Sequence, residues 1–90
     1  MAFASTYVKR VKLASGLVID KYTWSGATAT TGTITLQTST QPEITDVEMA
    51  TASNDADNAV VIALDAGQNK VKLTFTSGDS GTVSVLGVAR

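Results

Sequence analysis

The chain has 90 residues, a formal net charge of −1, and neither histidine nor cysteine. This length fits one domain, and the near-zero charge gives no overall field that would attract nucleic acid or an anionic membrane. Without histidine and cysteine, Ser-His-Asp and Cys-His catalysis and nearly every zinc site are excluded, so we predict a non-enzymatic single domain over residues 1–90 with no cofactor.

Alternation of apolar and polar residues with a period of two dominates the chain and predicts β-strands. The first predicted segment places three apolar side chains on one face and two basic ones on the other; these are Tyr7, Val11 and Leu13, opposed by Arg10 and Lys12. The second segment, residues 17–24, places Val18, Tyr22 and Trp24 on one side and Ile19 and Lys21 on the other. A small, polar loop follows over residues 25–32.

The remaining segments are also predicted as strands. Ile34 and Leu36 alternate with polar residues, and residues 43–50 fit a strand better than one isolated helical turn, because such a turn is costly to nucleate. Residues 59–64 and 70–76 follow, and then a final strand that contains Val83 and Val85. Turn-forming residues separate these three segments, which predicts two successive hairpins. The expected fold is therefore all-β: a small antiparallel β-sandwich or barrel of about seven short strands that ends in a β-meander.

Two polar segments resemble catalytic or metal sites. Gly78-Asp79-Ser80-Gly81 is similar to the nucleophile segment of chymotrypsin-like proteases, but with no histidine to accept the serine proton we interpret it as a hairpin turn. The carboxylate pairs Asp46/Glu48 and Asp55/Asp57 are interpreted as solvated surface. Oxygen ligands in the loop of residues 54–58 suit calcium, although their spacing does not match an EF-hand, so no metal site is predicted.

Aromatic and charged residues suggest contact surfaces. Tyr22 and Trp24 share a strand face and form either an exposed sugar-stacking platform or, in the alternative that we favour, an anchor of the core. Basic residues gather in the first two segments, whereas residues 43–65 contain six acids and no base; the basic strand of one copy could therefore meet the acidic region of another. An exposed edge strand must be paired or protected, so the candidate contact with other copies or with a partner protein is Phe3, Tyr7, Val8, Lys9, Arg10 and Lys12.

The layout resembles that of small β-rich structural proteins of tailed bacteriophages. The similarity lies in a start without a signal segment, a composition rich in Thr, Ser and Gly, and the segments of residues 31–36, 71–76 and 81–88. The size is similar to that of capsid decoration (cement) proteins, and this resemblance implies a homo-oligomer, with a trimer as one form, that binds the major capsid protein or another virion protein. It also implies synthesis in the host cytoplasm and location in the virion. The alternatives are a monomeric glycan- or protein-binding β-module and a head-completion or tail structural protein.

Overall fold

The computed structural model describes residues 3–13, 16–36, 44–65 and 70–89. These residues form seven strands, and no α-helix long and apolar enough to cross a membrane occurs among them. In chain order the strands are β1 (Ala4–Lys12), β2 (Leu17–Ser25), β3 (Thr31–Thr35), β4 (Ile44–Asn54), β5 (Val61–Asp65), β6 (Lys70–Thr74) and β7 (Ser80–Ala89).

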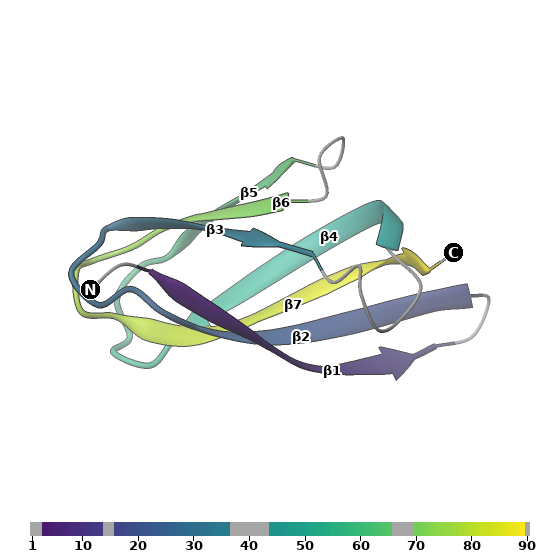
Figure 1. The fold of residues 1–90 in the computed structure, drawn as a ribbon, viewed down its shortest axis with the longest axis horizontal. Helices are drawn as coiled ribbons and strands as arrows, with labels where there is room; N and C mark the ends of the chain where they lie inside the picture. Colours follow the sequence, from purple (N-terminus) through teal and green to yellow (C-terminus); the bar gives the residue numbers. More distant parts are fainter. Residues whose placement is uncertain (1–2, 14–15, 37–43, 66–69, 90) are drawn as a thin grey trace.

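The strands pair antiparallel in two sheets. One sheet has the strand order β1-β2-β7-β4 and the other the order β3-β6-β5. Figure 1 shows them as two layers, with β3, β5 and β6 on one side of the molecule and β1, β2 and β7 on the other. The predicted all-β class and antiparallel architecture are therefore confirmed.

The core lies between the two sheets and is built from alternate residues of the central strands. Val83 and Val85 of β7 are fully buried, as are Val71 and Leu73 of β6. The remaining buried apolar residues are Val18, Tyr22, Trp24, Ile34, Leu36 and Phe75, each at most 6% exposed. The predicted division of residues 17–24 into two faces is confirmed, because Val18, Tyr22 and Trp24 all point into this core.

The predicted terminal β-meander is wrong in its second half. β5 and β6 pair with each other as expected, but β6 belongs to the three-stranded sheet and β7 to the four-stranded sheet. The turn between them crosses from one sheet to the other, with Gly78 at a φ of 89°. It is held against the turn after β2 by hydrogen bonds from the Gly26 amide to the Asp79 carbonyl (2.8 Å) and from the Gly78 amide to the Ala27 carbonyl (2.6 Å).

A β-bulge in β1 changes which residues face the core. The register pairs Tyr7 with Tyr22 and Lys9 with Lys21, so the ladder shifts by one residue between Tyr7 and Lys9. An extra residue in a strand reverses the facing of everything beyond it. The predicted common face of Tyr7, Val11 and Leu13 is therefore wrong: Tyr7 packs against the core, whereas Val11 lies opposite Ile19 on the outer face.

Candidate interaction surface

Of the six predicted contact residues, two aromatic ones serve the core instead. The ring of Phe3 stacks on those of Trp24 and Phe75, with centroid distances of 6.3 and 5.8 Å. Tyr7 meets Tyr22 edge to face at 5.6 Å. The predicted contact role of Phe3 and Tyr7 is therefore not supported, because both side chains are half-buried and pack against the core.

Arg10, a third predicted contact residue, is engaged in an internal ion pair. Its Nε lies 2.6 Å from Oδ1 of Asp20 and its Nη2 lies 2.9 Å from Oδ2, and the two side chains are only 2% and 0% exposed. The hydrogen bond from Arg10 to Asp20 raises the pKa of the guanidinium above its ordinary value. A paired, buried guanidinium is not available to another protein, so Arg10 positions β1 on β2 rather than binding a partner.

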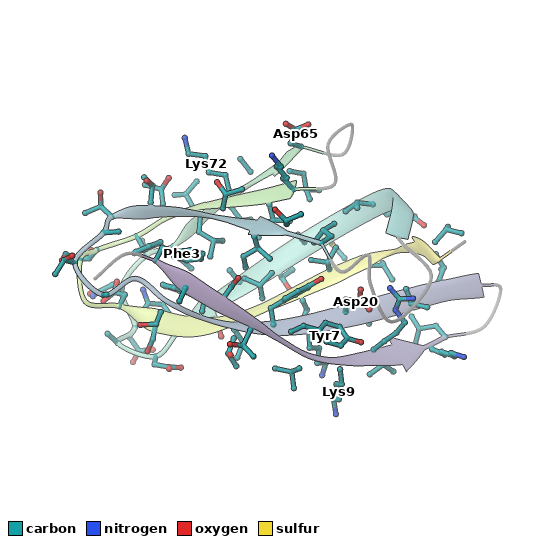
Figure 2. The ribbon with its side chains drawn as sticks, viewed as in Figure 1. Phe3, Tyr7, Lys9, Asp20, Asp65 and Lys72 are labelled. Atoms are coloured by element: carbon teal, nitrogen blue, oxygen red, sulfur yellow. The ribbon has the colours of Figure 1, made fainter. Side chains whose placement is uncertain are left out.

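The other three predicted contact residues are exposed. Val8 sits at the bulge with 52% of its surface accessible, and Lys9 and Lys12 are also exposed. In Figure 2 the side chain of Lys9 points away from the molecule, whereas Tyr7 and Asp20 lie on the side of the opposing sheet. Lys9 therefore lies on the outer face of β1, at the free edge of the four-stranded sheet, whereas Lys12 is opposite Val18 on the inner side.

The exposed aromatic platform proposed for Tyr22 and Trp24 is also wrong. Both residues are 3% exposed and belong to the core, and the Trp24 ring packs 4.7 Å from that of Phe75. The sequence correctly placed the two rings on one strand face, and this face is the inner one. The alternative interpretation, that they anchor the core, is confirmed.

The polar loop after β4 is held by a buried carboxylate. Asp79 is 5% exposed and accepts hydrogen bonds from Asn54 Nδ2 (2.7 Å), Asn58 Nδ2 (3.0 Å) and the Thr76 amide (3.2 Å). The Asn54 bond, with those of Asn58 and Thr76, holds the pKa of Asp79 below its usual value. The two asparagines therefore direct their side-chain NH2 groups, and not their carbonyl oxygens, toward this carboxylate.

The contacts of this loop and turn do not support a catalytic or a metal-binding site there. Ser80 donates its hydroxyl to Asp55 Oδ2 at 3.1 Å, so the segment that resembles a protease site is part of a hydrogen-bonded turn. Within the described ranges, no group of three or more His, Cys, Asp or Glu side chains is arranged to hold a metal ion. The described residues therefore provide no ligand cluster that would support calcium binding by the loop of residues 54–58.

An apolar row crosses the outer face of the four-stranded sheet. The registers place Val11 opposite Ile19, Ile19 opposite Leu86, and Leu86 opposite Met49. The row thus runs over β1, β2, β7 and β4 in turn, and we call these four residues the apolar row. None of them belongs to the hydrophobic core, and Met49 is 52% exposed.

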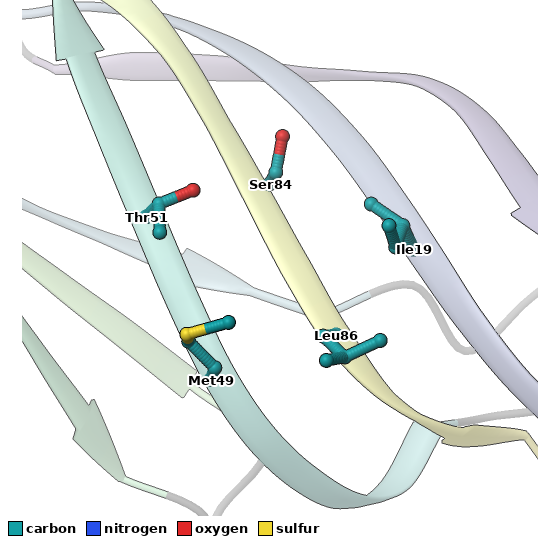
Figure 3. Close-up of a pocket in the computed structure, with 5 residues that line it drawn as sticks. All are labelled: Ile19, Met49, Thr51, Ser84 and Leu86. Atoms are coloured by element: carbon teal, nitrogen blue, oxygen red, sulfur yellow. The ribbon is translucent and has the colours of Figure 1, made fainter.

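The apolar row borders an open hollow of about 100 Å³. Its lining consists of Ile19, Met49, Thr51, Ser84 and Leu86. Figure 3 shows these side chains contributed by three neighbouring strands, β2, β7 and β4. Leu17 and Val88, which are opposite each other in the register, extend the apolar surface on the far side of the row.

The same outer face changes character along the strands. Beside the apolar row, Lys9 and Lys21 form a directly opposed cross-strand pair. Further along lie hydroxyl residues, of which Ser53 and Thr82 share a 2.7 Å hydrogen bond. On the opposite edge, Glu48 is the exposed extra residue of a bulge in β4. The candidate interaction surface is therefore apolar along the row and basic beside it, where β1 and β2 carry Lys9 and Lys21.

No protein family, curated protein or solved structure matches this chain.

Proposed function

We propose that this chain is a non-enzymatic structural protein that acts by docking on other protein subunits. The observation that carries the proposal is the apolar row with its hollow on the outer face of the four-stranded sheet. Contiguous apolar surface rimmed by polar residues is typical of protein–protein contact sites. The described residues leave this face outside the core, so a partner would cover what the domain itself does not.

The sequence resemblance narrows this role to a capsid decoration protein of a tailed bacteriophage. Such a protein binds the assembled shell and not its separated subunits, and it stabilises the shell by mass action. A modest contact is sufficient, because many symmetric copies bind at once. A small domain with a well-buried core and an apolar row on its outer face suits this task.

Co-sedimentation with capsids assembled from the major capsid protein of the same genome tests the proposal. We expect the wild-type protein to pellet with the shells and a Leu86→Lys variant to remain in the supernatant, because the change places a charge at the centre of the apolar row. Thr82→Lys is the matched control: it adds the same charge to the same face of β7, four residues away, and should leave binding intact. Absence of the wild-type protein from the pellet at every concentration would contradict the decoration role.

A further inference from the structure

We propose that the free edge of β5 is a self-association site, at which β5 of a second copy adds antiparallel and joins the two three-stranded sheets into one continuous sheet. This inference goes beyond the proposed function and does not rest on it, because it concerns the other sheet. β5 ends its sheet in the strand order β3-β6-β5, and Figure 1 shows it at the margin of its layer, beyond β6. No other described strand pairs with its second edge, so the main-chain N–H and C=O groups there suit an added strand.

The composition of β5 is that of a buried strand, although the strand is exposed. Residues 59–64 are all apolar and contain neither glycine nor proline, yet Val61 is 64% exposed and Leu64 is 40% exposed. Edge strands are usually protected against pairing by charged residues, bulges or proline. β5 lacks these features, because its register with β6 is regular and its one charged residue, Asp65, is its last.

The other three sheet edges are less suited to strand addition. β1 is interrupted by the bulge at Val8, and β4 has two register shifts, one of them at the exposed Glu48. β3 has threonine at every second position and contains Gly32, where the ring of Phe3 occupies the place of a side chain. Glycine weakens a strand. Among the described edges, β5 is therefore the one that presents a regular and apolar strand.

A second copy of β5 suits this edge because the strand is complementary to itself. A two-fold pairing centred on Ala63 places Ala63 opposite itself and Leu64 opposite Ile62 of the second copy. Within one chain, Ile62 lies opposite Leu73 and Leu64 opposite Val71, and both of these β6 residues are fully buried. The pairing thus continues the apolar inner face of one sheet into that of the other, and it covers the exposed side chain of Leu64.

The charges are compatible with this arrangement. In Figure 2 the side chains of Asp65 and Lys72 both point away from the opposing sheet. The antiparallel pairing places the two Asp65 carboxylates at opposite ends of the paired strands, so they do not face each other. Because a two-fold contact closes after two copies, the expected product is a dimer and not a fibre.

The size of the contact predicts weak association. β5 has five residues, and a pair of such strands buries less surface than the roughly 1,200 Å² of a stable interface. Sedimentation and light scattering at concentrations up to about 1 mM therefore measure the effect. We expect the mass to rise reversibly from the chain mass of 9.3 kDa toward that of a dimer.

Ala63→Glu is the disrupting variant. Ala63 is exposed and lies opposite Lys72 of β6, so a glutamate there meets an opposite charge within its own chain and should not impair folding, which circular dichroism checks. In the dimer the two glutamates stand directly opposite each other, and we expect self-association to weaken about fivefold. Thr33→Glu is the matched control, because Thr33 lies opposite the same lysine from the other side of β6. It should associate as the wild type does.

A mixture of two variants tests the register. Ala63→Lys alone should also weaken self-association about fivefold, for the same reason. An equimolar mixture of Ala63→Glu and Ala63→Lys should associate more tightly than either variant alone, because opposite charges then meet at the centre of the contact. A mixture no tighter than the separate variants would overturn the pairing centred on Ala63.

Amide hydrogen exchange locates the contact. Alternate amides of β5 should exchange more slowly at high concentration than on dilution, because they then donate to the second strand. Amides of β3, at the other edge of the same sheet, should exchange equally at both concentrations. Slowing at β3 and not at β5 would overturn the inference.

The outcomes separate this inference from the proposed function. A wild-type monomer at every concentration, a trimer, or a dimer that Ala63→Glu leaves intact would overturn the inference, whatever the shells bind. Leu86→Lys, which tests shell binding, should leave the dimer unchanged, because Leu86 lies on the four-stranded sheet. Loss of the dimer in Leu86→Lys would place the contact on the apolar row and would also overturn the inference.

Discussion

Two neighbouring rows of residues cross the four-stranded sheet, one on its inner face and one on its outer face. The inner row contains a charged pair, although it faces the core, and the outer row is apolar, although it faces away from the core. On the inner face, the row that crosses all four strands begins with the charged pair Arg10 and Asp20 and continues through Val85 and Ala50. One residue further along, on the outer face, lies the apolar row. Charge is thus buried and apolar surface is left outside at the same end of the same sheet.

The difference between the rows indicates that this end of the sheet is not arranged for stability alone. A buried ion pair costs desolvation energy that its attraction repays only with good geometry, and an exposed apolar row gives up burial energy. The ion pair has a specific structural use, because a slip of one residue would bring Lys9 or Val11 opposite Asp20 and reverse every facing of β1. The apolar row has no such use within the described domain, which is why we assign it to a partner.

The largest expected effect comes from breaking the ion pair. Asp20→Ala removes the buried carboxylate that pairs with the Arg10 guanidinium, and we expect the free energy of unfolding to fall by about 3–5 kcal/mol, measured by urea denaturation. For a domain of this size such a loss leaves little stability.

A double variant distinguishes lost charge compensation from lost packing. Arg10→Met combined with Asp20→Leu removes both charges and keeps most of the volume, so it should recover most of the stability. A double variant as unstable as Asp20→Ala would mean that the packing around the pair, and not the uncompensated charge, is responsible.

A smaller loss of unfolding free energy is expected from substitutions at two adjacent residues of β7. One residue lies on the inner face of the sheet and the other on the outer face, so the two variants compare these faces directly. Val85 is fully buried, so Val85→Ala should lower the free energy of unfolding by about 2 kcal/mol. Leu86 is outside the core, so Leu86→Ala should cost less than about 1 kcal/mol when measured at a concentration that keeps the protein monomeric. Equal costs would show that Leu86 is packed within the domain and would remove the main support for the interaction surface.

The local pattern of the sequence predicted the strands where no irregularity intervenes. β2 is the clearest case: alternation from Leu17 to Trp24 predicted both its extent and its two faces, because it has no bulge and its inner side carries large rings. The same alternation favoured a strand for residues 43–50, and the structure extends it to Asn54.

Non-local features could not be predicted in this way. No residue type around Val8 signals the bulge. The bulge nevertheless determines that Arg10 points inward and Val11 outward. The crossing between β6 and β7 uses the same glycine-rich turn residues as a hairpin. The apolar row is invisible along the chain, since its four members come from four strands and meet only through the registers of three strand pairs.

The smallest effect is expected at the second buried carboxylate, Asp79, and it depends on pH. Its pKa is lowered in the folded protein from the ordinary value of 3.8, so its contribution to stability is fully present above that value and is lost as pH falls through the lowered pKa. Asp20 is held by a guanidinium, whereas Asp79 is held by two neutral amides and a backbone N–H.

The melting temperature should therefore decline as the wild-type protein is taken from near neutrality to about pH 2. In Asp79→Asn, whose amide does not titrate, the decline over the same window should be shallower, and every other carboxyl group is common to both proteins. The difference between the two curves isolates Asp79. Parallel curves would mean that protonation of Asp79 does not loosen the contact between the loop after β4 and the turn before β7.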